Sequence, residues 1–447
     1  MNERKTRLVA GCMTGTSLDG IDVALVEIEG EGLAMTATFR GMVSRPLGEL
    51  SNTLRHFAEG GSAAAIGYMK AARTLGELHA EAVMELCRKH DIPIPKQGQS
   101  PPTPVGGSAT LDFIVAHGQT IWHAPEAKAE GQKNRKAEKG DAEAEPGVRW
   151  AGGEGRSAGY GVESAEDAES AEDAECEAAS GTGLSWQLLD PWPMVRRLRV
   201  PVCYDLRQAD LIAGGQGAPI TPLADWILYR SVPRPCAIVN LGGICNVTLL
   251  HDKAEDTRGR DVGPCNILLD TVVQRLYPGQ RYDEGGAIAC RGKVVQMLHQ
   301  AIVIDALAIL KEQRSLGREH FPLSVIEGWL ATAKKYETSE DIVATYTAAV
   351  ADLVVIGIKA TAKEAALKQV VLAGGGAKNP ALVEAIRKHD MLDLPVVRSD
   401  EVGIPCEARE AVGFAVLGAL SQDGVPITLE QVTGARQPGR AGAWVYP

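Results

Sequence analysis

Near the N-terminus, apolar and polar positions alternate in two runs that a polar turn separates. Leu8-Val9-Ala10 form a short apolar run, and Ile21, Val23 and Leu25 alternate with small or polar residues. A period of two residues is typical of a half-buried strand, so the pattern predicts strand, tight turn and strand. The turn, residues 11–20, contains glycines, two threonines, a serine and an aspartate.

Comparable patterns predict further elements along the chain. Apolar runs predict strands at 34–43, 111–116, 200–204, 236–239 and 369–373, and helical periodicity predicts helices at 63–88, after Pro222 and at 381–389. Aromatic residues make up only 5% of the chain, against 45% apolar residues in total. The cores must therefore be largely aliphatic, which suits layers of sheet and helix.

The opening pattern occurs a second time. The strand at 236–239 is followed by a glycine-rich polar turn at 240–246 and by the alternating run 247–250. Two such hairpins far apart in one chain indicate an internal duplication, with two similar domains that each begin with a hairpin aimed at a shared cleft. We expect domains at residues 1–204, with 405–447 returning to the first, and at 205–404.

The composition changes abruptly between residues 126 and 183. Lys, Glu, Ala and Gly dominate there, and the six residues from Ser164 are repeated from Ser170. Apolar residues are too few to offset the entropy of folding, so we predict a disordered acidic insertion. An isolated surface helix or an acidic interaction segment are the alternatives.

Composition and charge limit the function classes. The net charge of −11 over 447 residues argues against nucleic acid as a partner. The nine cysteines contain no C-x-x-C pair, which argues against a disulfide scaffold or a structural zinc site and favours buried thiols in a reducing compartment. No signal peptide or membrane span is expected, so the sequence predicts a cytoplasmic protein.

The candidate chemistry consists of glycine-rich turns and carboxylates at strand ends. The turn at 11–20 has no Walker A lysine, and the turn at 374–376 stands between a predicted strand and a predicted helix. Backbone N–H groups in such turns bind phosphate, and carboxylates hold magnesium or act as bases, so phosphoryl transfer is favoured. The alternative is that these residues only shape turns and cap helices. His117 and His123 are expected on a loop, as hydrogen-bonding residues rather than metal ligands.

A series of motifs runs over nearly the whole chain outside the acidic insertion. They are Gly11-x-Met13-Thr14-Gly15-Thr16-Ser17-Leu18-Asp19-Gly20-Ile21-Asp22, His117-Gly118-Gln119-Thr120-Ile121-Trp122-His123, Asp205-x-Arg207-x-x-Asp210 through Pro219, Asn240-x-Gly242-Gly243-Ile244-x-Asn246, Asp261-x-Gly263-Pro264-x-Asn266, Gly317-Arg318-Glu319-x-Phe321 and Gly374-Gly375-Gly376-Ala377-x-Asn379-Pro380. In content and order, this series resembles the anhydro-N-acetylmuramic acid kinase family, within the superfamily of sugar kinases, actin and the heat-shock ATPases.

The resemblance implies an α/β fold with two actin-like, ribonuclease H-like ATPase domains around a central cleft. It assigns the nucleotide phosphate loop to Gly15, Thr16, Ser17, Leu18, Asp19, Gly20, Ile21 and Asp22, and further nucleotide contacts to Gly242, Gly243, Asn246, Gly374, Gly375, Gly376 and Asn379. It assigns the sugar to His117, Gln119, Gln187, Asp205, Arg207, Asp210, Gln216 and Asn266. Asp261 is the implied base and Asp19 the implied magnesium ligand.

The implied reaction uses ATP and Mg²⁺ to open the 1,6-anhydro bridge of anhydro-N-acetylmuramic acid and to phosphorylate its 6-oxygen, as in peptidoglycan recycling. The expected partners are this sugar and ATP, with no nucleic acid or membrane, and a homodimer is left open. A levoglucosan kinase and a non-catalytic actin-like nucleotide-binding protein are the alternatives. Gln187-Leu188-Leu189-Asp190-Pro191 resembles a segment of the muramic acid enzymes and favours those.

Overall fold

The computed structural model describes residues 5–15, 18, 20–95, 110–124, 183–311, 323–333, 337–437 and 439–447. Apart from Gly183, the predicted acidic insertion at 126–183 lies outside these residues. Three predicted phosphate-loop residues, Thr16, Ser17 and Asp19, also lie outside them, as does the motif around Arg318.

The first sheet has the strand order β13-β7-β4-β1-β2-β3. β1, β2 and β3 form an antiparallel meander, whereas β4 and β7 continue the sheet parallel to β1. The strands are β1 (Thr6–Thr14), β2 (Gly20–Glu29), β3 (Thr36–Pro46), β4 (Phe113–Ala116), β7 (Val202–Tyr204) and β13 (Ala443–Val445). The strand predicted at 34–43 is therefore present, displaced toward the C-terminus.

The second sheet has the order β10-β9-β8-β11-β12 and repeats this arrangement. β8, β9 and β10 are antiparallel, and β11 and β12 continue parallel to β8. The strands are β8 (Cys236–Leu241), β9 (Ile244–Leu250), β10 (Arg258–Pro264), β11 (Gln369–Ala373) and β12 (Val396–Arg398). The duplicated hairpin and the α/β class are thus confirmed, while the domain bounds drawn from the sequence stay a prediction.

The remaining elements are helices and a small ribbon. The ribbon pairs β5 (Gln119–Ala124) with β6 (Leu184–Leu188). The α-helices are α1 (Leu50–Ala58), α2 (Ala65–Lys89), α3 (Trp192–Leu198), α4 (Gln208–Ile212), α5 (Pro222–Leu228), α6 (Asn266–Leu276), α7 (Gln296–Lys311), α8 (Leu323–Ala333), α9 (Ser339–Ala362), α10 (Pro380–Arg387), α11 (Arg409–Gln422) and α12 (Glu430–Thr433). Short 3-10 turns are η1 (Gly32–Ala34), η2 (Ala254–Asp256), η3 (Glu284–Gly286), η4 (Ala289–Arg291), η6 (Gly375–Lys378) and η7 (Ser399–Val402).

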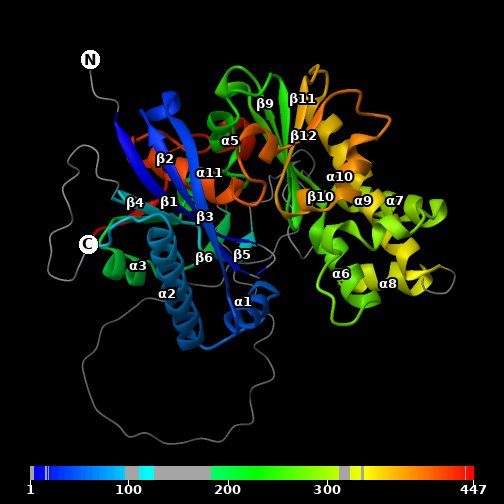
Figure 1. Cartoon of the computed structure of the whole chain (residues 1–447), viewed down its shortest axis with the longest axis horizontal. Coiled ribbons are helices and arrows are strands. Elements are labelled where there is room, and N and C mark those ends of the chain that lie inside the picture. Colours follow the sequence, from blue (N-terminus) through cyan, green and yellow to red (C-terminus); the bar gives the residue numbers. More distant parts are fainter. Residues whose placement is uncertain are drawn as a thin grey trace, which may run out of the picture. The chain divides into compact units, whose positions relative to one another are not determined.

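The first sheet is covered by two helices, one buried on a single face and the other buried almost completely. The predicted helix at 63–88 is α2, whose buried face includes Leu75, Val83 and Leu86 and packs with residues of β1 and β2. Helix α11 is buried along almost its whole length and belongs to a second cluster with other residues of β1 and β2. Figure 1 shows α11, from the C-terminal part of the chain, beside these N-terminal strands.

Helix α11 lies against β1 at a glycine. A Cβ placed on Gly11 would be 1.9 Å from the Ala411 carbonyl oxygen and 2.8 Å from the Ala415 nitrogen, both backbone atoms. We expect Gly11→Ala to lower the free energy of unfolding by about 3 kcal/mol, because backbone cannot yield as a side chain can. Urea denaturation followed by circular dichroism measures the change.

Gly413→Ala is the matched control, because it adds the same methyl group on α11 itself. The nearest atom to that methyl would be the Ala224 Cβ at 3.7 Å, an ordinary contact. Replacing glycine inside a helix should stabilise the protein by about 0.5–1 kcal/mol. Equal effects of the two substitutions would contradict the close packing of β1 on α11.

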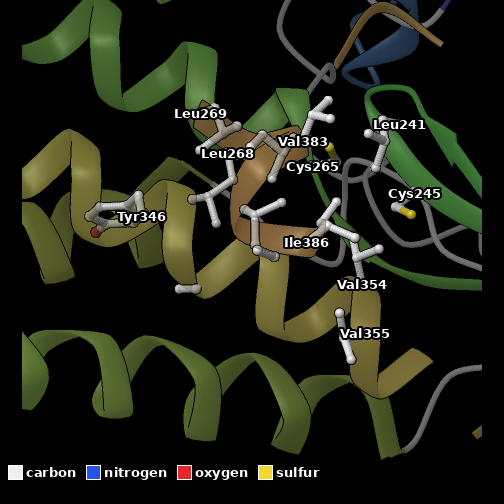
Figure 2. Packing of buried hydrophobic residues seen from close by; sticks show 14 of the residues in the cluster. Leu241, Cys245, Cys265, Leu268, Leu269, Tyr346, Val354, Val355, Val383 and Ile386 are labelled. Atoms are coloured by element: carbon white, nitrogen blue, oxygen red, sulfur yellow. The ribbon is translucent and has the colours of Figure 1, made fainter. Parts of the chain in front are cut away.

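Helix α9 is the central helix of the second sheet's core. Side chains of α6, α9 and α10 meet residues of β8 and β9 there, among them Leu268, Val354 and Ile386 (Figure 2). By length and composition α9 could cross a membrane, although most of it is buried inside the protein. The expectation that no apolar run approaches a membrane span was therefore wrong, because a core helix that is mostly buried needs the same apolar composition.

Candidate active site

Leu18, in the β1–β2 turn, has a strained backbone conformation and a buried side chain. The Leu18 N–H donates to the Gly15 carbonyl at 3.1 Å, and Leu18 has a φ of 57°, which is unusual for a branched side chain. The Leu18 side chain is buried, and the Ser51 hydroxyl donates to the Leu18 carbonyl oxygen at 2.5 Å. Leu18 therefore anchors the turn that the sequence predicts as the phosphate loop.

The predicted loop continues into β2, where Gly20, Ile21 and Asp22 are paired with β3. Ile21 is fully buried in the core, so its packing holds the start of β2, next to the turn, in place. The Asp22 carboxylate accepts a hydrogen bond of 2.5 Å from the Ser44 hydroxyl.

A second group of predicted nucleotide residues meets around the β8–β9 turn. The Asn266 N–H donates to the Gly242 carbonyl, and the Cys265 N–H donates to the Gly243 carbonyl, both at 3.0 Å. A Cβ on Gly376 would lie 2.9 Å from Asn266 Oδ1. The β8–β9 turn, the start of α6 and the turn after β11 are therefore packed as one unit.

The turn after β11 also approaches two asparagines. A Cβ on Gly374, whose φ is 82°, would lie 2.5 Å from Asn240 Oδ1, so only glycine fits there. Gly375, in contrast, has open space around it apart from Asn266 Nδ2 at 3.7 Å. The Oδ1 atoms of Asn240 and Asn246 are buried and have no hydrogen-bond partner within the described part of the chain. Such buried acceptors call for a donor that the described residues do not supply.

Asn379 has a structural contact in addition to its predicted nucleotide role. Its side chain accepts a hydrogen bond of 3.2 Å from the Leu382 N–H and caps α10. A Cβ on Gly286 would lie 2.4 Å from Asn379 Oδ1, so η3 packs directly on this cap.

Three of the other predicted sugar-binding residues, His117, Asp210 and Gln216, lie in one hydrogen-bonded group with Arg207. The Arg207 Nε donates to His117 Nε2 at 3.0 Å, and its Nη1 donates to the Gly217 carbonyl at 2.6 Å. The Asp210 carboxylate accepts from the Gly217 N–H at 2.8 Å and from the Thr433 hydroxyl at 2.6 Å. Gln216 lies in the same loop, where its N–H donates to the Thr433 carbonyl at 3.0 Å.

The electrostatics of this group keep Arg207 charged and His117 neutral. The pKa of Arg207 is lowered to about 10, because burial lowers it by more than the carboxylates of Asp261, Glu410 and Asp210 raise it. Burial and, after it, the charge of Arg207 together lower the pKa of His117 to about 3. Because neutral His117 donates from Nδ1 to the Gly118 carbonyl at 2.9 Å, its Nε2 is free to accept from Arg207.

Asp261 and Glu410, whose carboxylates both raise the pKa of Arg207, belong to separate elements. Asp261 lies on β10 opposite Asn246, beside a bulge between Asp261 and Gly263. Glu410 lies in the first turn of α11 and accepts from Asn240 Nδ2 at 3.0 Å. The predicted base, Asp261, and Glu410 therefore interact electrostatically with the same buried cation, Arg207. The motifs did not single out Glu410. In the sequence, Glu410 is only a charged residue at the start of an apolar helix.

The ribbon of β5 and β6 corrects the loop expected for His123, whereas His117 does lie on a loop, between β4 and β5. His117 precedes β5, and His123 lies within it, paired with Ser185 of β6. Gln187 is buried on β6, and Gln119 is buried at the start of β5. The local sequence hid the strand because β5 is short and its partner β6 lies about 60 residues further on.

Asp205 links this ribbon to α4. Asp205 has a φ of 55°, and burial raises the pKa of its carboxyl while a hydrogen bond from Gln208 lowers it. The Gln208 Nε2 also donates to the Ser185 carbonyl at 2.6 Å.

The family model that matches this chain is described as anhydro-N-acetylmuramic acid kinase, over residues 7–134 and 176–447. The chain belongs to this family. The anhydro-N-acetylmuramic acid kinase of Caldanaerobacter subterraneus subsp. tengcongensis is 31% identical over 97% of this chain and 96% of its own length. That of Prochlorococcus marinus is 28% identical over 98% and 99%. The resemblance drawn from the motifs is confirmed.

The solved structures that this chain matches are more distant. Component A of the (R)-2-hydroxyglutaryl-CoA dehydratase of Acidaminococcus fermentans is 11% identical, with a TM-score of 0.41 over 93% of this chain and 99% of its own. A ROK family glucokinase from Streptomyces griseus, in complex with glucose and AMPPNP, is 13% identical, with a TM-score of 0.35 over 92% and 98%.

Proposed function

We propose that the protein is an ATP-dependent kinase that opens the anhydro bridge of anhydro-N-acetylmuramic acid and phosphorylates its 6-oxygen. Its membership of the kinase family supports the reaction class. The observation that carries the proposal is that the carboxylates of Asp261 and Glu410 both raise the pKa of the buried Arg207, whose charge in turn lowers the pKa of His123 on β5. A binding protein without chemistry would have no need of a carboxylate held in that position.

The two glycine-rich turns are assigned to ATP. At Gly374 and Gly376 the neighbouring atoms leave no room for a side chain, so only the backbone is present to bind phosphate. The buried Oδ1 atoms of Asn240 and Asn246 fit a hydrogen-bond donor such as a ribose hydroxyl or a metal-bound water. Mg²⁺ would be held by Asp19 together with ATP phosphates, and it neutralises charge on the transferred phosphoryl group. The hydroxyls of Thr16 and Ser17 are assigned to the phosphates.

The sugar is assigned to the region around Arg207, with His117, Gln119, Gln187, Asp205, Asp210 and Gln216 as its predicted binding residues. Asn266, which was also predicted to bind the sugar, lies at the β8–β9 turn beside the residues assigned to ATP. Asp261 takes a proton from water as the water oxygen bonds to the anomeric carbon, and the bond from that carbon to O6 breaks. The freed O6 then bonds to the γ-phosphorus of ATP, and the bond from that phosphorus to the leaving ADP breaks. Arg207 stays protonated and balances the carboxylates during these steps.

We further propose that this reaction takes place in the cytoplasm. Of the described cysteines, seven are buried free thiols and only Cys290 is exposed, which suits a reducing compartment. The partners are then ATP and the anhydro sugar.

An assay of ATP turnover with separate anhydro sugars tests the proposal. We expect ADP formation with anhydro-N-acetylmuramic acid and far less with levoglucosan, and none when EDTA removes magnesium. Turnover with levoglucosan alone would favour the alternative kinase. ATP binding without turnover on either sugar would favour a non-catalytic nucleotide-binding protein.

A further inference from the structure

A polar network on one face of the β5–β6 ribbon has the Ser185 hydroxyl at its centre. Ser185 Oγ donates to the Trp122 carbonyl at 3.3 Å. It therefore accepts from its other two neighbours, Gln187 Nε2 at 2.7 Å and His123 Nδ1 at 3.0 Å. Gln187 Nε2 also donates to the Thr120 hydroxyl at 3.3 Å.

The hydrogen bonds within this network leave His123 and Gln187 with one acceptor atom each. His123 Nδ1 carries the proton. Because burial and the charge of Arg207 together lower the pKa of His123 to about 4, Nε2 keeps its lone pair at neutral pH. Gln187 uses its amide nitrogen within the network, so its Oε1 is left as an acceptor. His123 Nε2 and Gln187 Oε1 are both buried and lack a hydrogen-bond partner in the described residues.

Two buried acceptors without donors indicate a ligand that brings hydrogen-bond donors. Only Gln187 of the two was expected at the sugar, so His123 is an additional candidate. Anhydro-N-acetylmuramic acid at neutral pH offers two donors, the 4-hydroxyl and the acetamido N–H, because its other ring oxygens are in ether or bridge bonds and its carboxyl is ionised.

We propose that His123 Nε2 and Gln187 Oε1 accept the two hydrogen bonds that this sugar can donate. The inference rests on the proposed function and extends it to the orientation of the substrate. The lactyl carboxylate must then point away from the ribbon, since an anion beside two acceptors would be repelled. His123 is a specificity-determining contact, and Ser185 is the residue that positions it.

Three substitutions at His123 separate a substrate contact from a structural role. His123→Phe removes both ring nitrogens. His123→Asn can keep the bond to Ser185 but cannot reach the position of Nε2, whereas His123→Gln can place an acceptor near that position. We expect kcat/KM for the sugar to fall about three- to tenfold in the Phe and Asn variants, with partial recovery in the Gln variant and an unchanged KM for ATP.

Each variant is measured with anhydro-N-acetylmuramic acid and with 1,6-anhydro-N-acetylglucosamine, which lacks the lactyl group but keeps both donors. Equal losses on the two sugars support the proposal. A loss confined to the muramic sugar would mean that His123 faces the lactyl group, and an unchanged Asn variant would mean that Nε2 contacts no substrate. Either result overturns the proposal.

Calorimetric titration of both sugars into wild type and variants makes the inference independent of turnover. A wild type that binds sugar and never forms ADP would refute the kinase proposal, yet weaker binding by the Asn variant would still support the contact. Sugar binding that is equal in wild type and all three variants would refute the contact alone. A wild type that binds neither sugar would refute both.

Discussion

Asp261→Asn should lower turnover by about two to four orders of magnitude while sugar and ATP still bind, because the amide keeps the shape of the carboxylate and loses its basicity. Asp261 is one of the carboxylates that raise the pKa of Arg207, but Arg207 remains protonated at neutral pH without it. The loss should therefore appear in kcat. Steady-state ADP release with saturating sugar and magnesium ATP measures it.

Asp256→Asn is the matched control for this experiment, since it makes the same change on the exposed turn that leads into β10. We expect wild-type kinetics from it. A near-normal kcat for Asp261→Asn would move the base elsewhere, with Asp205 or Asp210 as the next candidates.

The same reaction in oxygen-18 water tests the order of bond changes. The proposed attack of water on the anomeric carbon places the label on the anomeric hydroxyl of the product and none on the phosphate. Mass spectrometry of the phosphorylated sugar and of any free phosphate reads the position. Label in phosphate would mean that water attacks ATP, and the protein would then be an ATPase.

The two hairpins could be predicted because their signals are local. A period of two residues on either side of a glycine turn needs no information from the rest of the chain, and both β1–β2 and β8–β9 formed where the pattern indicated them. The family followed from motifs of the same local kind. The assignment of individual motif residues to ATP, magnesium and sugar is still a prediction.

Contacts across long sequence distances could not be predicted in this way. Glu410 accepts from Asn240 and raises the pKa of Arg207 only because α11 returns to the first sheet and its N-terminal turn meets β8. The acceptors of His123 and Gln187 depend on the pairing of β5 with β6. No pattern within ten or twenty residues carries that information, so neither feature could be predicted from local sequence.

The start of α11 depends on a buried ion pair between Arg409 and Asp225 of α5. Arg409 Nε donates to Asp225 Oδ1 at 2.9 Å, Nη2 donates to Oδ2, and both side chains are 1% exposed. Arg409 Nη2 also donates to the Thr221 hydroxyl at 3.2 Å. Because Arg409 directly precedes Glu410, the ion pair also holds in place the Glu410 backbone, whose side-chain carboxylate raises the pKa of Arg207.

Arg409→Met should lower the free energy of unfolding by about 3–5 kcal/mol, because it leaves the Asp225 carboxylate buried without its cation. Arg409→Met combined with Asp225→Leu removes both charges and should recover much of that loss, since a buried pair contributes little beyond an apolar pair of similar volume. Arg40→Met provides the exposed comparison. Its pair with Glu27 is half in solvent and should matter by less than about 1 kcal/mol.

Urea titration of the three variants and wild type, followed by circular dichroism, distinguishes the two possible sources of the lost stability, an unpaired buried charge or lost packing and hydrogen bonds. If the double variant is as unstable as Arg409→Met, the loss comes from packing and hydrogen bonds around α11 rather than from an unpaired charge. Activity gives a separate result. A double variant that regains stability but keeps a depressed kcat would show that Arg409 positions Glu410, and full recovery of kcat would confine the pair to a structural role.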